Sequence, residues 1–335
     1  MALTMSDVAR AAGVSVMTVS NVLNDRPRVG AATRERVLAV VAELGYEIDL
    51  TARRLRTGRT GTVALVVPRF DHQYYAELAA LLATAFAENG HHLVVEQSNA
   101  SRENELAAVS PARLRFYDGI VLSAVGLTAE DVTHLRGEVP LVLLGEQDLP
   151  EVVDHVMMAN AEGARLATEH LLERGSRRIA VLGGARVGDV AGGIGPQRTA
   201  GWRAAHRARG LEPPEELVAP VSDHGSGGAR GATTELFRRY PDVDAVFAVT
   251  DQLAVGALAA LHDLGRRVPE EVRVIGFDNL DLLAQVPPGL STVDPSNAWI
   301  VEQTVELLER RIADPAAPAV LRESPVRVVA RGSTD

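Results

Sequence analysis

The first 24 residues constrain the fold most, because they predict two short helices separated by one tight turn. Thr4 and Asp7 have the spacing of a capping box, in which the acid also favours the positive end of a helix. Gly13 can adopt the positive φ that ends this helix, and Ser15 can cap the next one. An ordinary helical hairpin would carry similar signals, but the pattern favours a helix-turn-helix, an element that reads DNA.

The second predicted helix has one face for packing and another that is free for contacts. The residues expected to face inward are Val19, Val22 and Leu23. Those expected on the outer face, where a recognition helix meets base edges, are Val16, Met17, Ser20 and Asn21.

Further segments follow in an order typical of one protein family. They are Asn24–Gly30 as a loop, Thr33–Tyr46 as a third helix, Ala52–Thr60 as a hinge helix and linker, and Thr62–Pro68 as a first strand, with Asp118–Leu122, Thr250–Gly256 and Val274–Asp278 farther on. Each motif alone is weakly specific, but so many in one order are highly specific. Over its whole length the chain therefore resembles a LacI/GalR-type transcriptional regulator.

This resemblance implies a fold and a division into domains. The expected fold class is α/β: an all-α helix-turn-helix head, then a two-lobed, periplasmic-binding-protein-like body of doubly wound parallel sheets. The head would span residues 1–47, the hinge helix and linker 48–61, and the effector-binding and dimerisation domain 62–335. Lobe 1 would comprise about 62–160 and 294–323, and lobe 2 about 161–293 and 324–332.

The body shows the alternation of apolar runs and helical periods that predicts a parallel sheet. The predicted strands are Val63–Val67, Leu93–Gln97, Gly119–Ser123, Leu141–Leu144, Ile179–Gly183, Ala245–Val249, Val272–Gly276 and Val326–Ala330. The predicted helices include Tyr75–Asn89, Ala161–Arg174, Gly201–Arg209 and Leu253–Leu264. The rhythm occurs twice, which predicts two lobes, and ligands bind at the carboxyl ends of such strands. A cleft between the lobes is therefore the expected pocket.

Composition narrows the class of protein. The net charge is −10, yet residues 1–60 carry nine arginines against six acidic residues, so a basic head precedes an acidic body. No cysteine is present, which excludes disulfides and thiol nucleophiles and suits a reducing cytoplasm. No signal-like or membrane-spanning apolar run appears, so we expect no membrane association.

The resemblance also implies which residues contact DNA. The predicted set is Thr4, Ser15, Val16, Met17, Thr18, Ser20, Asn21, Asn24, Arg53 and Leu55. Asn21 stands where the family often has Arg, and Asn favours adenine where Arg favours guanine, so the preferred base can differ. Two further departures are Ile48 in place of a common Pro and Gly30 in place of a capping Ser. The hinge, with Leu55, would order on DNA and enter the minor groove.

The effector pocket is likewise implied by resemblance. Arg198 matches the family's effector-contacting Arg, Asp278 its hydroxyl acceptor, and Tyr74 a stacking aromatic; Thr250 stands where Asn is common. Such a donor and acceptor pair suits a sugar or another polyol, although an Arg–Asp ion pair that only braces the cleft is the alternative. Gly145 replaces an Asp and Pro295 a Gln of some sugar-binding members.

Three other signals are weaker. Gly183–Gly195 lacks the spacing of a phosphate-binding loop, so we interpret it as a loop near the pocket mouth. His224–Gly228 resembles a nucleophile elbow only loosely, and a flexible loop is the favoured interpretation. His91 and His92 lack a nearby third ligand and are expected to be a surface pair. We therefore expect no enzyme activity, no metal and no cofactor.

The sequence as a whole predicts a cytoplasmic, homodimeric regulator, most simply a repressor. Its partners would be a palindromic double-stranded operator and a small, sugar-like effector. The alternative is a sugar-binding receptor without DNA-binding activity, which would lack the N-terminal head. No leucine heptads follow the last predicted strand, so a tetramer built on a C-terminal helix bundle is not expected.

Overall fold

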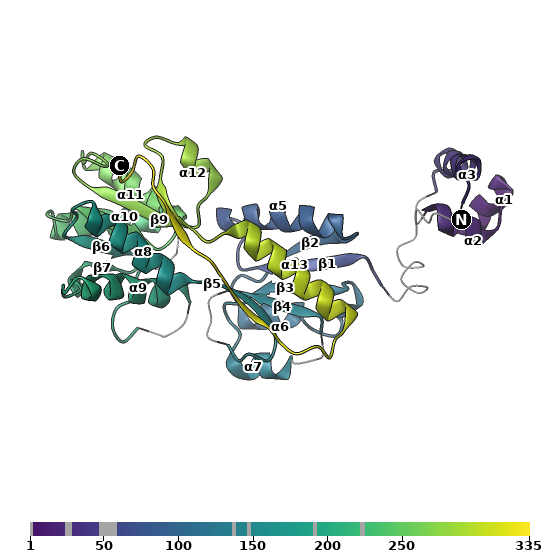
Figure 1. The fold of residues 1–335 in the computed structure, drawn as a ribbon, viewed down its shortest axis with the longest axis horizontal. Helices are drawn as coiled ribbons and strands as arrows, with labels where there is room; N and C mark the ends of the chain where they lie inside the picture. Colours follow the sequence, from purple (N-terminus) through teal and green to yellow (C-terminus); the bar gives the residue numbers. More distant parts are fainter. Residues whose placement is uncertain are drawn as a thin grey trace. The chain divides into compact units, whose positions relative to one another are not determined.

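The computed structural model describes residues 3–23, 29–46, 59–135, 139–145, 149–189, 193–221 and 225–335. The chain divides into two compact units, Met1–Thr60 and Gly61–Asp335 (Figure 1). We call the first unit the head and the second the body. The predicted fold class, a helical head with an α/β body of two parallel-sheet lobes, is confirmed.

The head consists of three helices, α1 (Met5–Ala12), α2 (Val16–Leu23) and α3 (Ala31–Leu44). Asp7 Oδ2 accepts the Thr4 backbone N–H at 3.0 Å and the Thr4 hydroxyl at 2.7 Å, so the predicted N-terminal cap of α1 is present. Gly13 ends α1 with φ 65°, and Ser15 Oγ accepts the Thr18 N–H at 3.1 Å. Since these interactions are local, the turn between α1 and α2 is specified by a few neighbouring residues.

A small apolar cluster holds the three helices of the head together. Its buried members are Val8, Ala9, Ala12, Val19, Val22, Val37 and Tyr46. Leu23, Val41 and Leu44 pack against them and are only partly buried. The predicted inward face of α2 is thus confirmed, with Leu23 at its margin.

The body contains two six-stranded sheets, and we name the lobes after them. Lobe 1 has the strand order β11–β5–β4–β3–β1–β2, and every neighbouring pair is parallel. Its strands are β1 (Thr62–Val67), β2 (His92–Gln97), β3 (Gly119–Ser123), β4 (Leu141–Leu144), β5 (Asp154–Met158) and β11 (Leu321–Ser324). Alternation along β1 sends Val63, Leu65 and Val67 into one apolar layer and Ala64 and Val66 into another.

Helices cover both faces of the lobe 1 sheet, as a parallel sheet requires. On one face lie α5 (Gln73–Glu88) and α13 (Asn297–Ala313), which contact each other (Figure 1). On the other lie α6 (Arg102–Ala108) and α7 (Ala129–His134), whose Ala108 and Val132 join the second apolar layer. A short 3₁₀ helix spans Arg113–Arg115.

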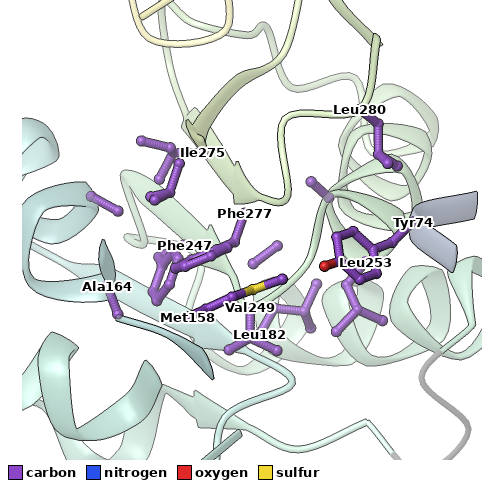
Figure 2. Packing of buried hydrophobic residues seen from close by; sticks show 14 of the residues in the cluster. Tyr74, Met158, Ala164, Leu182, Phe247, Val249, Leu253, Ile275, Phe277 and Leu280 are labelled. Atoms are coloured by element: carbon purple, nitrogen blue, oxygen red, sulfur yellow. The ribbon is translucent and has the colours of Figure 1, made fainter. Parts of the chain in front are cut away.

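Lobe 2 repeats this plan with the order β12–β10–β9–β8–β6–β7, and only the β10–β12 pair is antiparallel. Its strands are β6 (Ile179–Leu182), β7 (Val218–Ala219), β8 (Ala245–Ala248), β9 (Arg273–Phe277), β10 (Ser291–Asp294) and β12 (Arg327–Val329). Its helices are α8 (Asn160–Glu173), α9 (Ile194–Ala208), α10 (Ser226–Arg239), α11 (Asp251–Asp263) and α12 (Asp281–Gln285), with a 3₁₀ helix at Glu215–Leu217. Figure 2 shows Phe247, Ile275 and Phe277 of lobe 2 in one buried cluster with Tyr74 and Met158 of lobe 1.

The chain passes between the lobes three times, after β5, after β10 and after β11. Each lobe therefore contains segments that are distant in sequence. Lobe 1 receives α13 and β11 from the C-terminal part of the chain, and lobe 2 receives β12 from the same region. Among the residues that the structure describes, no helix combines the length and apolar character needed to span a bilayer.

All eight predicted strands are present, but four observed strands, β5, β7, β10 and β11, were not predicted. These strands are short or polar: β7 has two residues, β10 reads Ser-Thr-Val-Asp, and β11 reads Leu-Arg-Glu-Ser. The predicted helix Gly201–Arg209 was wrong at its start, since α9 begins at Ile194. The sequence pattern did not predict this start, because Gly195 and Pro196 are residues that disfavour a helix interior. Pro is nevertheless tolerated in the first turn of a helix.

Candidate functional site

Helix α2 carries half of the residues predicted to contact DNA. Met17 is 71% exposed and Val16 is 43% exposed, whereas Ser20 and Asn21 are half-buried. Thr4 and Ser15 are exposed, and the Ser15 and Thr18 hydroxyls are 2.9 Å apart. Ser20 and Asn21 therefore lie at the edge of the exposed face of α2. Asn24, Arg53 and Leu55 lie outside the described residues.

A cavity of about 910 Å³ lies in the body. Its lining includes residues that follow the carboxyl ends of strands in both sheets: Pro68 after β1, Ala124 after β3, Gly145 after β4, Gly183 after β6 and Asp278 after β9. Ligands of doubly wound folds bind at such strand ends. All five residues predicted for the effector pocket line this cavity, namely Tyr74, Gly145, Arg198, Thr250 and Asp278.

Arg198 extends from α9 and is 1% exposed, although it borders the cavity. Its Nε donates to Asn160 Oδ1 at 2.7 Å, and its Nη1 donates to the Val249 carbonyl oxygen. Nη1 also lies 3.4 Å from Asp278 Oδ1. The guanidinium is thus fixed by several partners, and its ion pair with Asp278 is long.

Asp278 lies at the end of β9 with φ 123°, a conformation unfavourable for a residue with a side chain. Its Oδ2 is buried and has no hydrogen-bond partner among the described residues. Burial raises the pKa of the Asp278 carboxyl, and the neighbouring Asp251 carboxylate raises it further, against the opposing effect of Arg198. Oδ2 of Asp278 is therefore a buried polar atom whose hydrogen bonding is incomplete.

Asp251, the first residue of α11, stabilises the backbone next to Asp278. Its Oδ1 accepts the Thr292 hydroxyl at 2.6 Å, and its Oδ2 accepts the Leu280 N–H at 2.9 Å. Burial raises the pKa of this carboxyl as well. Thr250, just before it, caps α11 by accepting the Leu253 N–H at 3.2 Å, so its hydroxyl has a structural role.

On the lobe 1 side, Tyr74 is almost fully buried and packs edge-on against Tyr75, with ring centroids 5.2 Å apart. Gly145 has φ 124°, and a Cβ there would lie 3.1 Å from the Ala124 carbonyl oxygen. His155 Nε2 is 2.9 Å from the Gly145 carbonyl oxygen, and burial lowers the pKa of this histidine. The glycine thus allows a close backbone turn and leaves this part of the wall without a side chain.

The buried carboxylate of Glu105 stabilises the backbone of one wall of the cavity. The Glu105 carboxylate on α6 is 0% exposed and accepts the backbone N–H groups of Val125, Gly126 and Leu127 at distances of 3.0 Å. Val125 and Leu127 line the cavity. Burial raises the pKa of Glu105, and the three N–H groups partly offset this effect. Sequence analysis missed this residue, because nothing in its local sequence distinguishes it from the exposed Glu103 on the same helix.

Asp131, paired with Arg102, stabilises the residues that follow in the same wall. Asp131 accepts the Thr128 N–H at 2.8 Å and the Thr128 hydroxyl at 2.7 Å, which caps α7. Arg102 donates to both oxygens of Asp131 and lowers the pKa of that carboxyl. A Cβ on Gly126 would lie 2.5 Å from the Arg102 backbone nitrogen, so the loop packs directly on α6.

The predicted surface pair of histidines is wrong for His91. His91 is only 7% exposed, with Nε2 2.9 Å from Glu309 Oε1 and Nδ1 3.9 Å from Asp118 Oδ2. Glu309 comes from α13, a segment that sequence spacing did not connect with His91. The Asp118 carboxylate also accepts the N–H of Gly61, the first residue of the body, at 2.7 Å. His92 is exposed, as predicted.

The other weak signals have different outcomes. Several residues between Gly183 and Gly195 border the cavity, in keeping with a loop near the pocket, but Ile194 and Gly195 belong to α9. His224 lies outside the described residues, and α10 begins at Ser226. Within the described ranges, no group of three or more His, Cys, Asp or Glu side chains could hold a metal ion.

Comparisons with known proteins agree with this geometry. A family model described as "Bacterial regulatory proteins, lacI family" matches residues 4–48, and a "Periplasmic binding protein-like domain" matches residues 168–334. The chain is 35% identical over 322 residues to the HTH-type transcriptional regulator CelR of Thermobifida fusca, covering 92% of each chain. It is 30% identical to the ribose operon repressor of Halalkalibacterium halodurans, covering 99% of this chain and 97% of that one.

A solved structure is similar over nearly the full length. It is the complex of the transcriptional regulator CelR with cellobiose, with a TM-score of 0.71, 32% identity and 99% coverage of both chains. The matches therefore include the head and both lobes.

Proposed function

Since the chain belongs to the LacI family of bacterial regulatory proteins, we propose that it acts as a homodimeric repressor controlled by a small polar effector. The observation that carries this proposal is the joint presence of an exposed α2 face and a large cavity between strand ends. A binding receptor without DNA activity would have no use for the head.

The α2 face and its flanking residues are the proposed surface for DNA. We assign direct readout to Val16, Met17 and Asn21, and backbone or flanking contacts to Thr4, Ser15, Thr18 and Ser20. From the sequence alone we add Asn24, Arg53 and Leu55. Two heads from a homodimer would contact the two halves of a near-palindromic operator, since twofold protein symmetry matches palindromic DNA.

The cavity is the proposed effector site, with Tyr74, Gly145, Arg198, Thr250 and Asp278 in its wall. A ligand that contacts both lobes binds best to one arrangement of them and shifts the equilibrium toward it. The N–H of Gly61 is hydrogen-bonded to Asp118, so the start of the body is attached to lobe 1. Movement of lobe 1 would then change the spacing of the two linkers in a dimer.

The relatives support a sugar-like effector. One relative is named a ribose operon repressor, and a solved relative holds cellobiose. The Arg198 and Asp278 pair offers hydrogen-bond donors and an acceptor, as a polyol requires. We further propose that the protein works in the cytoplasm and catalyses no reaction, in keeping with the regulators that it resembles.

Selection from a random library of double-stranded DNA tests the function. The full-length protein should enrich one near-palindromic sequence and bind it with a stoichiometry of one dimer per site. Enrichment of no sequence, with binding that falls steeply with salt on every DNA, would contradict sequence-specific regulation.

A further inference from the structure

Two consecutive residues at the cavity have backbone conformations that side chains disfavour. Asp278, in the cavity wall, has φ 123°, and Asn279, directly after it, has φ 55°. Residues with a side chain keep a positive φ only where their surroundings hold them there, although Asn tolerates the left-handed region better than most. The direction of the Asp278 carboxyl therefore depends on the contacts that fix these two residues, which we call the 278–279 turn.

The backbone of the 278–279 turn is held by β10 and by Asp251. The Asp278 N–H donates to the Val293 carbonyl oxygen at 3.0 Å, and the Asn279 N–H donates to Thr292 Oγ1 at 3.2 Å. The Thr292 hydroxyl donates in turn to Asp251. These bonds involve the main chain of the turn, so the Asn279 side chain must be fixed by a different contact.

Arg331 supplies the contact to the Asn279 side chain. Its Nη2 donates to Asn279 Oδ1 at 2.7 Å, and its Nη1 donates to the Leu290 carbonyl oxygen at 2.7 Å. The guanidinium thus joins the 278–279 turn to the residue that precedes β10. Arg331 is not among the described residues that line the cavity, so its effect on a ligand there is indirect.

The segment that carries Arg331 is packed into lobe 2. Ser333 is 0% exposed, and its hydroxyl donates to the Val274 carbonyl oxygen at 2.6 Å. A Cβ on Gly332 would lie 2.1 Å from the Pro288 carbonyl oxygen, so the backbone here lies directly against its neighbour. This packing fixes the backbone from which the Arg331 side chain extends.

The charge of Arg331 also acts on Asp251. Burial raises the pKa of the Asp251 carboxyl, and the positive charge of Arg331 is one of the effects that oppose this rise. Arg331 therefore favours the ionised form of Asp251, which accepts the Leu280 N–H at 2.9 Å directly after the 278–279 turn. The same arginine thus stabilises the turn at Asn279 and supports the carboxylate that holds the next residue.

We infer that Arg331 is a positioning residue for the effector: through Asn279 it fixes the 278–279 turn, and thereby the Asp278 carboxyl in the cavity wall. A group that is already in place loses little conformational entropy when a ligand arrives, which favours affinity. Without Arg331, the turn relaxes toward ordinary φ values and the carboxyl moves with it. The inference rests on the proposed effector-binding function and adds to it a residue that does not touch the ligand.

Calorimetric titration of full-length variants tests the inference. The probes are cellobiose, D-ribose, D-glucose, D-galactose and D-xylose, and the sugar that binds the wild type most tightly is used for comparison. Arg331→Ala should weaken its binding about tenfold, the change expected when a hydrogen bond to a charged group is lost. Asn279→Gly should weaken it to a similar extent, because glycine adopts a positive φ without strain but has no side chain for Arg331 to hold.

A double variant and a control in the same segment distinguish positioning from a general loss of stability. The combination of Arg331→Ala with Asn279→Gly should lose about as much affinity as either change alone, because both remove the same contact. Ser333→Ala removes a buried hydroxyl that makes no contact with Asn279. It should lower the temperature of thermal unfolding and leave the affinity for the sugar unchanged.

Hydrogen exchange gives a readout that needs no sugar. The amides of Asp278 and Asn279 should exchange faster in Arg331→Ala and Asn279→Gly than in the wild type, and at the wild-type rate in Ser333→Ala. If none of the five sugars binds the wild type, these rates alone decide between support and failure. Thermal unfolding shows whether each variant folds. If Arg331→Ala is misfolded, Asn279→Gly carries the test, because it leaves the contact between Arg331 and Leu290 in place.

The results that would overturn the inference differ from those that would overturn the proposed function. Unchanged affinity in either single variant, an equal loss in Ser333→Ala, additive losses in the double variant or, where no sugar binds, unchanged exchange would each overturn the positioning role of Arg331. Each of these results leaves the proposed regulatory function standing if the protein still selects a palindromic DNA. Loss of DNA selection would instead overturn that function, whatever the sugar affinities are.

Discussion

The guanidinium of Arg198 lies over the ring of Phe277, with Cζ 3.4 Å from the ring centroid. Stacking of this kind fixes the plane of the guanidinium, and the Asn160 contact fixes its edge. Arg198 is thus held in place before any ligand arrives. A preorganised cation loses little conformational entropy on binding, which favours effector affinity.

Arg198→Ala should leave operator affinity nearly intact while abolishing the influence of the effector on it, because the head is a separate compact unit. Arg198→Lys should also abolish the influence of the effector on operator affinity. An ammonium group cannot stack on the Phe277 ring or donate two parallel hydrogen bonds as a guanidinium does. Operator titrations with and without a binding glycoside measure both effects. Arg207→Ala, which removes an exposed arginine from the same helix as Arg198, is the matched control. Normal effector binding by Arg198→Ala would show that the arginine only braces the cleft.

Asp278 should make stability depend on pH in a defined direction. Its folded-state pKa is raised above 3.8, so the native state holds a proton that the unfolded chain releases as the pH rises above about 4. The difference in the free energy of unfolding between the wild type and Asp278→Asn (wild type minus variant) should therefore fall as the pH rises above about 4. The fall should be at most about 1.4 kcal/mol per pH unit. Urea unfolding at several pH values measures it.

Asp71→Asn provides the contrast for this pH series. The hydrogen bond from Arg69 lowers the pKa of Asp71, so the corresponding difference in unfolding free energy should change with the opposite sign. A flat or rising difference for Asp278→Asn would mean that Asp278 is ionised in the folded protein.

Asn21→Ala should weaken binding to the selected operator by about 1–3 kcal/mol and binding to random DNA only slightly. The reason is that a base-specific contact is lost while phosphate contacts remain. Fluorescence anisotropy with both DNAs measures the two affinities, and Asn89→Ala in the body is a matched control. If both DNAs lose affinity equally, Asn21 positions the backbone or supports the fold.

Two glycine substitutions should have opposite effects on stability. A Cβ on Gly201 would lie 2.0 Å from the Ala161 carbonyl oxygen, so Gly201→Ala should separate α8 from α9 and cost about 1–3 kcal/mol. Gly231 is exposed within α10 and has open space around it, so Gly231→Ala should stabilise by about 0.5–1 kcal/mol. Denaturant unfolding followed by circular dichroism compares them, and similar effects of the two would refute close packing at Gly201.

Glu105→Gln should loosen the cavity wall. The amide retains one acceptor oxygen but places N–H donors against the backbone N–H groups of Val125 to Leu127, at a cost of about 1–3 kcal/mol. Faster hydrogen exchange at these amides is the expected result. Glu103→Gln, an exposed change on the same helix, is the control. Equal hydrogen-exchange rates at these amides in both variants would show that Glu105 does not stabilise the wall.

Local features were predictable from the sequence because the interacting residues are neighbours. The Thr4–Asp7 cap, the Gly13 turn and the Ser15 cap each involve residues within one helical turn. Long apolar strands such as β1 and β3 were also predictable, since burial on both faces gives continuous apolar runs.

Contacts between residues that are distant in the sequence could not be predicted from local sequence patterns. His91 and Glu309, or Glu105 and Leu127, meet only because the fold brings their elements together. β11 lies at a sheet edge and carries exposed polar residues, so no apolar pattern marks it. Periodicity alone could not bring Tyr74, Arg198 and Asp278 to one cavity; resemblance to a family suggested it.

The three crossings between the lobes have a consequence for synthesis of the chain. Lobe 1 needs α13 to cover one face of its sheet and β11 to complete an edge, and both leave the ribosome after all but the last strand of lobe 2. Until then, the apolar layer formed by residues such as Val63 and Leu65 is only partly covered. The head, in contrast, comprises only the first 60 residues, whose synthesis takes on the order of 3–12 s at about 5–20 residues per second. A nascent chain would therefore carry a folded head long before it has an effector site to control it.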